Sequence, residues 1–364
     1  MNALIAPEHI WIEGGLRTGL AVEMAAGRVA RIRPLAEGEV PTSRPHLMMP
    51  ACTDLQVNGS GGVMLNDGPS PETIARIIAA QRARGTGWVL PTLITSAPAQ
   101  IAAAADAVIE AWGLPGLAGL HLEGPHINVE RKGTHDPRHI RPMDEATLAA
   151  LERLRAAGIP VMLTLAPEIV PPGTIARIAE MGVIVSAGHT AASPAQAKAG
   201  LSAGVSCFTH LFNAMPPMTS RAPGVVATAI NSEAYCGIIA DGIHVDWAML
   251  ALACAARPVP GRMFLVSDAM ATVGGPDHFT LYGERIELRG GALVNAAGAL
   301  AGAHIDMLAS LGNMVRHAGL PLEAAVAMAC DNPNRAMGLT PPAIEPGRAL
   351  DELVMLDAAL ERTG

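Results

Sequence analysis

The stretch VMLTLAPEIVPPGTIARIAEMGVIVSAGHT, residues 161–190, contains the alternation that decides the fold. It begins with the apolar run VMLTLAPE (161–168), continues with PGTIARIAEMG (172–182), whose apolar side chains recur with a helical period, and ends with VIVSAGHT (183–190). The middle segment starts with Pro and closes on Gly, which are start and stop signals of a helix. Two near-continuous apolar strands joined by a helix are typical of a parallel sheet with both faces covered.

The same pattern extends over most of the chain. Ala-rich segments of helical period alternate with eight apolar runs, at 50–59, 88–96, 116–125, 161–168, 183–190, 206–215, 236–245 and 263–270. Eight strand-and-helix units predict an α/β fold with a (β/α)8 TIM-like barrel. A doubly wound open sheet is the alternative, but no GxGxxG motif follows the first apolar run.

The two ends of the chain follow a different pattern. Residues 1–50 alternate apolar and polar side chains with Gly at the turns, which predicts short antiparallel strands. ELVMLD (352–357) reads as a further strand, which we expect to join them. We therefore predict a barrel over residues 51–335 and a small β-sandwich domain made from the chain termini, residues 1–50 and 336–364.

Composition excludes several classes of function. The 364 residues carry a formal net charge of −8 and no run of Lys and Arg with interleaved aromatic residues, which argues against nucleic acid as a partner. No apolar run reaches the length of a membrane span, and the N-terminal stretch lacks the pattern of a signal peptide, so we expect a cytoplasmic protein without a membrane partner. The cysteines form no CxxC pair and are expected to be small core residues; they are Cys52, Cys207, Cys236, Cys254 and Cys330.

Polar side chains gather at the C-terminal ends of the predicted strands. They are Asp54, Gln56, Asn58, Glu123, His189, His210, Asp241, His244 and Asp268. In a barrel these strand ends converge on one mouth, which is where active sites lie. A single histidine at a strand end is more often a hydrogen-bonded core residue, but burying the whole set unpaired would cost several kcal/mol for each group. The set therefore predicts an active site.

Glu123, His189 and His210 have the composition of a catalytic metal site. Three nitrogen and oxygen ligands leave a further position open for water, and this ligand type suits zinc, iron or cobalt. A carboxylate is still needed to take a proton from the water and pass it to the leaving group. Asp268, at the end of the last strand, is positioned for that role; the alternative is that it caps a helix that begins at SDAM.

Five motifs carry a resemblance to a known family. They are HLEGPHINVERKGTHD (121–136), SAGHT (186–190), FTHLFNAMPPMTSRAPG (208–224), ADGIHVD (240–246) and LVSDAM (265–270). Over nearly its full length the chain resembles the amidohydrolase superfamily and, within it, the N-acetylglucosamine-6-phosphate deacetylase family. The resemblance implies a metal-dependent barrel that hydrolyses the acetamide of N-acetyl-D-glucosamine 6-phosphate to D-glucosamine 6-phosphate and acetate, in amino-sugar catabolism.

The resemblance also implies roles for single residues. Glu123, His189 and His210 would hold one divalent ion per subunit, zinc, iron or cobalt, and Asp268 would be the general acid/base. The resemblance further implies a homodimer in which the neighbouring subunit donates part of the phosphate site. The implied contacts to the small phosphorylated amino sugar are Thr134, His135, Asn213, Ala214, Arg221, Asp241, His244, Leu300, Ala301 and Gly302. Among them, Arg221 suits a phosphate because a guanidinium can bind it through two hydrogen bonds.

Two departures from the superfamily pattern bear on the site. Gln56 and Asn58 stand where many amidohydrolases carry HxH, and VMLTLAPE (161–168) contains no lysine, so we predict a single metal. The two amides serve either as a network that braces the mouth or as substrate contacts. In the late loop AGAHIDM (301–307), His304 and Asp306 add bulk and possible charge, which leaves the sugar and the acyl group open.

Other functions remain as alternatives. An N-acetylgalactosamine-6-phosphate deacetylase, whose substrate has one epimerised hydroxyl, fits almost as well. Another mononuclear amidohydrolase that acts on an anionic amide, such as a cyclic-amide hydrolase or a deaminase, is a broader alternative. A barrel that has lost catalysis and serves as a binding module is disfavoured, because all three metal ligands and Asp268 are present. Simple surface ion pairs are a further alternative for Arg221 and His244, which their positions beside NAMPP and DGIH disfavour.

Overall fold

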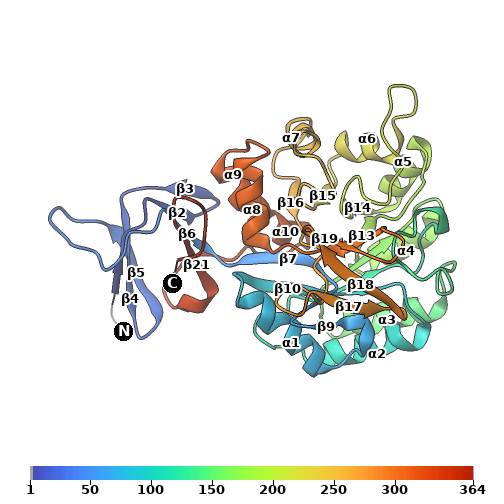
Figure 1. Cartoon of the computed structure of the whole chain (residues 1–364), viewed down its shortest axis with the longest axis horizontal. Coiled ribbons are helices and arrows are strands. Elements are labelled where there is room, and N and C mark those ends of the chain that lie inside the picture. The colour runs from blue at the N-terminus through green and yellow to red at the C-terminus, as the bar shows by residue number, and fades with distance from the viewer. Residues whose placement is uncertain (1–2, 364) are drawn as a thin grey trace.

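The computed structural model describes residues 3–363 of the chain. It consists of a large barrel and a smaller part built of strands, and both ends of the described chain lie in the smaller part (Figure 1). Within residues 3–363, no helix combines the length and the apolar character that crossing a membrane requires.

The barrel is built on one parallel sheet. Its eight strands follow one another in the sheet in the order of the chain; they are β7 (Cys52–Val57), β10 (Thr86–Ile94), β11 (Leu120–Glu123), β12 (Val161–Leu165), β13 (Ile184–Ala187), β14 (Val205–Phe208), β15 (Tyr235–Ile238) and β16 (Met263–Leu265). The sheet closes at its C-terminal edge, where the backbone N–H groups of Asn58 and Gly59 donate to the carbonyl of Ala269 at 2.9 and 3.0 Å. The predicted (β/α)8 barrel is confirmed.

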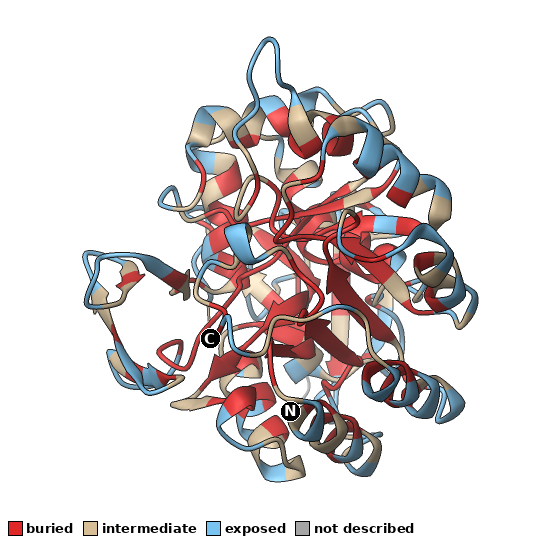
Figure 2. Ribbon diagram, turned by 90° about the vertical axis from the view of Figure 1, so that its right-hand side faces the viewer, coloured by how far each residue is buried: buried red, intermediate tan, exposed pale blue. Residues whose placement is uncertain are grey.

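Helices cover the outside of this sheet. They are α1 (Pro71–Arg82), α2 (Pro98–Glu110), α3 (Glu145–Ala156), α4 (Pro172–Glu180), α5 (Pro194–Ala203), α6 (Gly224–Ile230), α7 (Trp247–Ala255), α8 (Met307–Arg316), α9 (Leu322–Ala329) and α10 (Asp331–Ala336). In α4, Pro172 occupies the first turn, where its missing N–H has no intrahelical partner to lose, and Ile175 and Ile178 are fully buried toward the sheet. Figure 2 shows the buried strands at the centre and exposed surface on the surrounding helices.

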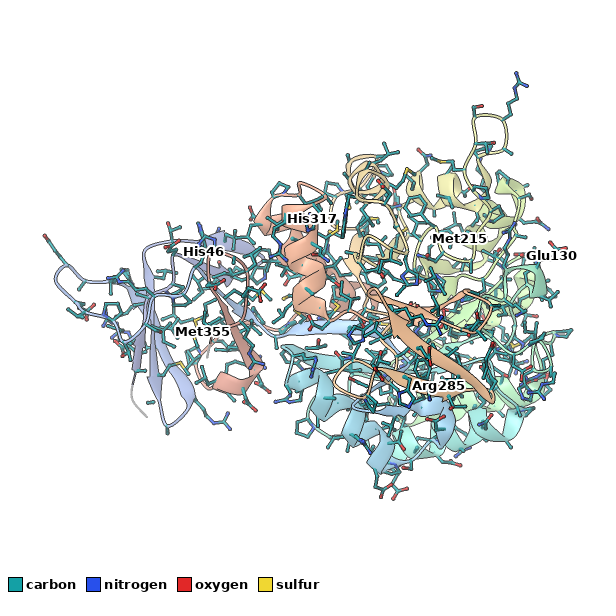
Figure 3. All side chains as sticks on the ribbon, in the orientation of Figure 1. His46, Glu130, Met215, Arg285, His317 and Met355 are labelled. Carbon is teal, nitrogen blue, oxygen red and sulfur yellow. The ribbon has the colours of Figure 1, made fainter. Side chains whose placement is uncertain are left out.

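An antiparallel sheet follows the last barrel strand. Its strands are β17 (His278–Leu281), β18 (Glu284–Arg289), β19 (Ala292–Val294) and β20 (Leu300–Ala303). It lies in front of the barrel strands in Figure 1, and Figure 3 labels Arg285 on β18. Its apolar residues Phe279, Leu281 and Ile286 pack with Ile94 and Met270 of the barrel in one buried cluster. The sheet therefore forms one wall of the barrel mouth. A shorter pair, β8 (Gly59–Ser60) and β9 (Val63–Met64), follows β7.

The smaller part contains two sheets that face each other. One has β1 (Ala3–Ile5), β4 (Leu20–Ala25) and β5 (Arg28–Pro34); the other has β2 (His9–Ile12), β3 (Gly15–Arg17), β6 (Leu47–Pro50) and β21 (Leu353–Leu356). Val22 and Met24 of the first sheet share a core with Ile10, Met48 and Leu353 of the second. Figure 3 labels Met355 of β21 and His46, just before β6, in this part. The sandwich from the chain termini is confirmed, whereas the domain boundaries 1–50 with 336–364 and 51–335 stay predictions.

The cysteines behave as the sequence analysis expects. Four of them are buried and the fifth, Cys254, is partly buried. Burial raises the pKa of the Cys254 thiol to about 12, so that a thiolate does not form at neutral pH. The four buried cysteines are therefore core residues, as expected.

Candidate active site

Three predicted ligands converge at the barrel mouth. Glu123 is the last residue of β11, and His189 and His210 each follow the end of a strand, β13 and β14, by two residues. The carboxylate Oε1 of Glu123 lies 3.2 Å from Nε2 of His189 and 2.9 Å from Nε2 of His210. The two Nε2 atoms are 3.1 Å apart, and the exposed fractions of the three residues are 2, 5 and 4%. One ligand atom from each residue therefore points at a common centre.

The chemistry of these donors fits a divalent cation. Nδ1 of His189 lies 2.8 Å from the carbonyl oxygen of Arg131, which only a ring N–H can pair with. In the neutral ring the lone pair is then on Nε2, which faces the cluster, and a backbone carbonyl bonded to the far ring nitrogen gives histidine ligands this arrangement. Two imidazoles and one carboxylate make a ligand set that suits zinc, iron or cobalt.

The buried side chains of the cluster shift one another's pKa values. Burial by itself would raise the pKa of Glu123, but the imidazoles of His189 and His210 outweigh it and hold that pKa well below its usual range. Burial likewise opposes protonation of His210, yet the bond to Glu123 raises its pKa. Burial, together with the nearby His189, holds the pKa of His135 well below its usual range. Glu123 is thus ionised and available as an anionic ligand.

Asp268 lies across the same space as a second carboxylate. Burial, and then the negative charge of Glu123, raise its pKa to about 6. Its Oδ1 accepts hydrogen bonds from Asn58 Nδ2 at 2.6 Å and from Gln56 Nε2 at 3.1 Å. A turn follows Asp268, and no helix among the described residues begins there, so the alternative assignment of Asp268 as a helix cap is wrong.

Gln56 and Asn58 form the bracing network that was one of their two predicted roles. Gln56 Nε2 also donates to Glu123 Oε1, at 3.0 Å, and so links the two carboxylates. Asn58 additionally faces the cavity of the site, whereas Gln56 does not line it. The two amides therefore donate hydrogen bonds to both carboxylates of the site.

Backbone strain is concentrated at this site. His189, His210 and Asp268 have φ angles of 48°, 28° and 51°, in the left-handed region that residues with a Cβ rarely adopt. Each such residue costs on the order of 1 kcal/mol or more, and it persists where the surrounding structure holds it in place. Three strained residues whose side chains meet at one mouth indicate a functional constraint.

A cavity of 230 Å³ opens beside these groups. Seven predicted substrate contacts line it: Thr134, His135, Asn213, Ala214, His244, Leu300 and Gly302. The remaining three do not. Ala301 is buried behind the wall, and Asp241 holds His244 through Oδ2 and Nδ1, 2.6 Å apart. Arg221 is exposed on the loop that precedes α6 and projects from the barrel (Figure 1).

His304 and Asp306 lie away from this cavity. Nδ1 of His304 lies 2.9 Å from Thr272 Oγ1, and the ring lines a separate cavity of 520 Å³ that also contains Arg84. Asp306 caps α8 by accepting a hydrogen bond from the backbone N–H of Ala309 at 2.9 Å. The added bulk and charge of the late loop therefore lie outside the cavity of the candidate site, and their effect on the choice of sugar or acyl group stays an open prediction.

Several residues of the site were missed in the sequence. Ile94, Gly133 and Met270 also line the cavity. Buried below it, His121 bonds through Nε2 to Thr164 Oγ1 at 2.8 Å, and burial lowers its pKa to about 4. Thr95 bonds to His135, Oγ1 to Nδ1, at 2.7 Å. Residues such as Thr95, Ile94 and Met270 could not be singled out in the sequence, because threonine and apolar residues at strand ends are also ordinary core residues.

Comparisons with known proteins agree with this geometry. The profile of the amidohydrolase family matches residues 47–361. An N-acetylgalactosamine-6-phosphate deacetylase of Shewanella sp. (strain ANA-3) is 37% identical over 88% of this chain and 83% of the relative. An N-acetylglucosamine-6-phosphate deacetylase of Haemophilus influenzae is 35% identical over 79 and 76%. The crystal structure of N-acetylglucosamine-6-phosphate deacetylase from Pasteurella multocida superposes with a TM-score of 0.88 and 30% identity, over 100% of this chain and 97% of that one.

Proposed function

Since this chain belongs to the amidohydrolase family, and within it to the N-acetylglucosamine-6-phosphate deacetylase family, we propose that it hydrolyses the acetamide of an N-acetylated hexosamine 6-phosphate. The products are acetate and the amino-sugar phosphate. The observation that carries the proposal is the convergence of Glu123, His189 and His210 on one centre, with Asp268 beside the same cavity.

Glu123, His189 and His210 would hold one divalent ion. Bound there, the ion supplies Lewis acidity toward the amide and lowers the pKa of a water molecule. Zinc is our first candidate by ligand type, with iron or cobalt as the others. We propose a single ion, because Gln56 and Asn58 present neutral amides that already donate to Glu123 and Asp268.

Asp268 moves the proton in this scheme. Its raised pKa, about 6, lets it accept a proton from the attacking water and release it again near neutral pH. The water oxygen forms a bond to the acetyl carbon, the C–N bond breaks, and the proton passes from Asp268 to the leaving nitrogen. His135, buried at the cavity wall, would donate a hydrogen bond to the carbonyl oxygen as negative charge develops on it.

The other lining residues would hold the sugar. We propose that Thr134, Asn213, Ala214 and His244 contact its polar groups, since they line the cavity. Leu300 and Gly302 on β20 would close over it, with the buried Ala301 holding that strand in the wall. Asp241 would orient His244 through their hydrogen bond.

Arg221 requires a partner subunit in this proposal. Its exposed position outside the cavity suits a phosphate contact only in the site of a neighbouring molecule. We therefore propose a homodimer in which each Arg221 reaches across, and we expect the dimer to act in the cytoplasm.

The sugar epimer divides the two leading functions. Relatives with both names match this chain, at 37% identity for an N-acetylgalactosamine 6-phosphate enzyme and 35% for an N-acetylglucosamine 6-phosphate enzyme. Acetate release from each of these two phosphates, and from unphosphorylated N-acetylglucosamine, tests the proposal on protein of measured metal content. We expect acetate release only from the phosphorylated sugars. The epimer from which acetate is released faster is then the preferred substrate. Metal-loaded protein that releases acetate from neither phosphate would overturn the proposal.

A further inference from the structure

Thr95 makes a contact that the proposed reaction does not yet use. It is the residue after β10, and its Oγ1 lies 2.7 Å from Nδ1 of His135. Both side chains are buried, with exposed fractions of 1 and 2%. Among the residues that the structure describes, this is the single hydrogen bond of the Thr95 hydroxyl.

Two close approaches hold Thr95 in place. The hydroxyl of Tyr282, in the turn between β17 and β18, donates to the carbonyl oxygen of Thr95 at 2.7 Å. On the other side, a Cβ at Gly124 would lie 2.4 Å from Thr95 Oγ1, closer than any real contact. Glycine at position 124 therefore makes the room in which the Thr95 hydroxyl meets His135.

The other nitrogen of His135 faces the metal ligands. Nε2 lies 3.8 Å from Oε2 of Glu123, and the His135 ring centre is 4.2 Å from that of His189. A neutral imidazole has one N–H, so the bond to Thr95 and the neighbour at Nε2 together decide which nitrogen carries the proton.

Both contacts favour the proton on Nε2. If Nδ1 carried it, Nδ1 would donate to Thr95, and the buried threonine O–H would have no acceptor among the described residues; an unmet buried donor is costly. The unprotonated Nε2 would also face the Glu123 carboxylate, so that two hydrogen-bond acceptors would face each other. With the proton on Nε2, Thr95 donates to Nδ1 and Nε2–H faces the carboxylate, so each group meets a partner of the opposite kind.

We propose that Thr95 is a positioning residue that fixes His135 as the Nε2–H tautomer, so that the ring presents a donor to the carbonyl oxygen of the amide being cleaved. The inference rests on the proposed deacetylation and assigns to it a further residue. Thr95 acts through His135 and does not itself line the cavity.

The direct test is ¹⁵N NMR of histidine-labelled, zinc-loaded protein, with the His135 signals identified by their loss in His135→Gln. We expect a protonated Nε2 and an unprotonated Nδ1 in the wild type and in Thr95→Ser. In Thr95→Val, which keeps the shape and removes the hydroxyl, we expect a proton population on Nδ1. The kcat for the hexosamine phosphate should fall at least about tenfold in Thr95→Val, with KM and zinc content nearly unchanged, because a donor to the developing charge is lost.

Thr86→Val is the matched control. Thr86 is a buried threonine of the same strand β10, and its Oγ1 has no hydrogen-bond partner in residues 3–363. Loss of the Thr86 hydroxyl should change neither the ¹⁵N signals of His135 nor kcat. A wild-type ring protonated on Nδ1 would overturn the inference, and so would a Thr95→Val protein with the wild-type tautomer and kcat. The tautomer is read without turnover, so a failure of the proposed substrate would show separately as zinc-loaded wild type that releases no acetate.

Discussion

Asp268 and Glu123 are carboxylates of one site that experience opposite environments. Burial raises the pKa of Asp268 to about 6, whereas the neighbouring imidazoles of His189 and His210 hold the pKa of Glu123 well below its usual range. A carboxyl group that titrates near neutral pH can exchange protons, and one that stays ionised can hold a cation. The division of roles between them follows from their contacts.

Asn58 lowers the pKa of Asp268 through a hydrogen bond. Its Nδ2 donates to Asp268 Oδ1 at 2.6 Å, and this bond lowers the pKa of Asp268 by favouring the charged form. Asn58→Leu keeps the size and removes the donor, so the pKa of Asp268 should rise. The acidic limb of the profile of kcat/KM against pH should then move to higher pH, because more of the enzyme holds the unreactive, protonated Asp268 at a given pH. A limb that stays in place, or moves to lower pH, would contradict this role.

The start of helix α8 offers a test that separates stability from function. Asp306 accepts a hydrogen bond from the N–H of Ala309 and does not line the active-site cavity. Loss of such a cap costs about 1 kcal/mol. Asp306→Ala should therefore lower the unfolding temperature, while Asp306→Asn, which keeps the cap, should change it much less. In both variants kcat/KM should stay within about twofold of the wild type, since 0.4 kcal/mol is about twofold; a larger loss would place the late loop in the site after all.

Regular elements could be predicted from the sequence because their signals are local. The apolar runs and the helical periods of residues 161–190 correspond to β12, α4 and β13, and the strand ends bring Glu123, His189 and His210 together. Side-chain direction after an element ends is not local. His304 follows a wall strand but faces Thr272, and the role of Thr95 depends on a turn contact from Tyr282 far along the chain.

Closure of the barrel joins residues far apart in the chain. Asp54 on β7 accepts hydrogen bonds from the side chain and the backbone of Ser267, which follows β16. Burial raises the pKa of Asp54 to about 7, and the bonds from Ser267 only partly offset it. Ionisation of this carboxyl at the seam therefore opposes folding.

The stability of the whole molecule should depend on pH through Asp54. An unfolded aspartate has a pKa of about 4, below the folded value of about 7. The stability that Asp54 contributes is then fully present below about pH 4 and is lost as pH rises through about 7. Thermal unfolding of metal-free wild type and Asp54→Asn should show the wild type losing stability relative to the variant over this window. A constant difference between the two from pH 4 to 8 would contradict the raised pKa.

Two variants with different defects, assayed at a phosphorylated-sugar concentration well below the raised KM, can test whether Arg221 acts across a dimer. Arg221→Ala should raise KM for the phosphorylated sugar, with little effect on the unphosphorylated one, because it removes a phosphate contact. Mixed with Asp268→Asn and allowed to exchange subunits, it should recover activity, since one site of the mixed dimer then has both an intact Asp268 and a partner's Arg221. No recovery in a mixture shown to contain mixed dimers would mean that Arg221 does not serve the neighbouring site.

The proposed reaction depends on Glu123 holding a metal and on Asp268 moving a proton. Metal content and acetate release, measured together on Glu123→Gln and Asp268→Asn beside the wild type, test both roles. We predict that Glu123→Gln loses metal and activity together, and that Asp268→Asn keeps its metal while kcat falls by about 10²–10⁴-fold. Full metal occupancy in Glu123→Gln, or near wild-type turnover in Asp268→Asn, would contradict the account.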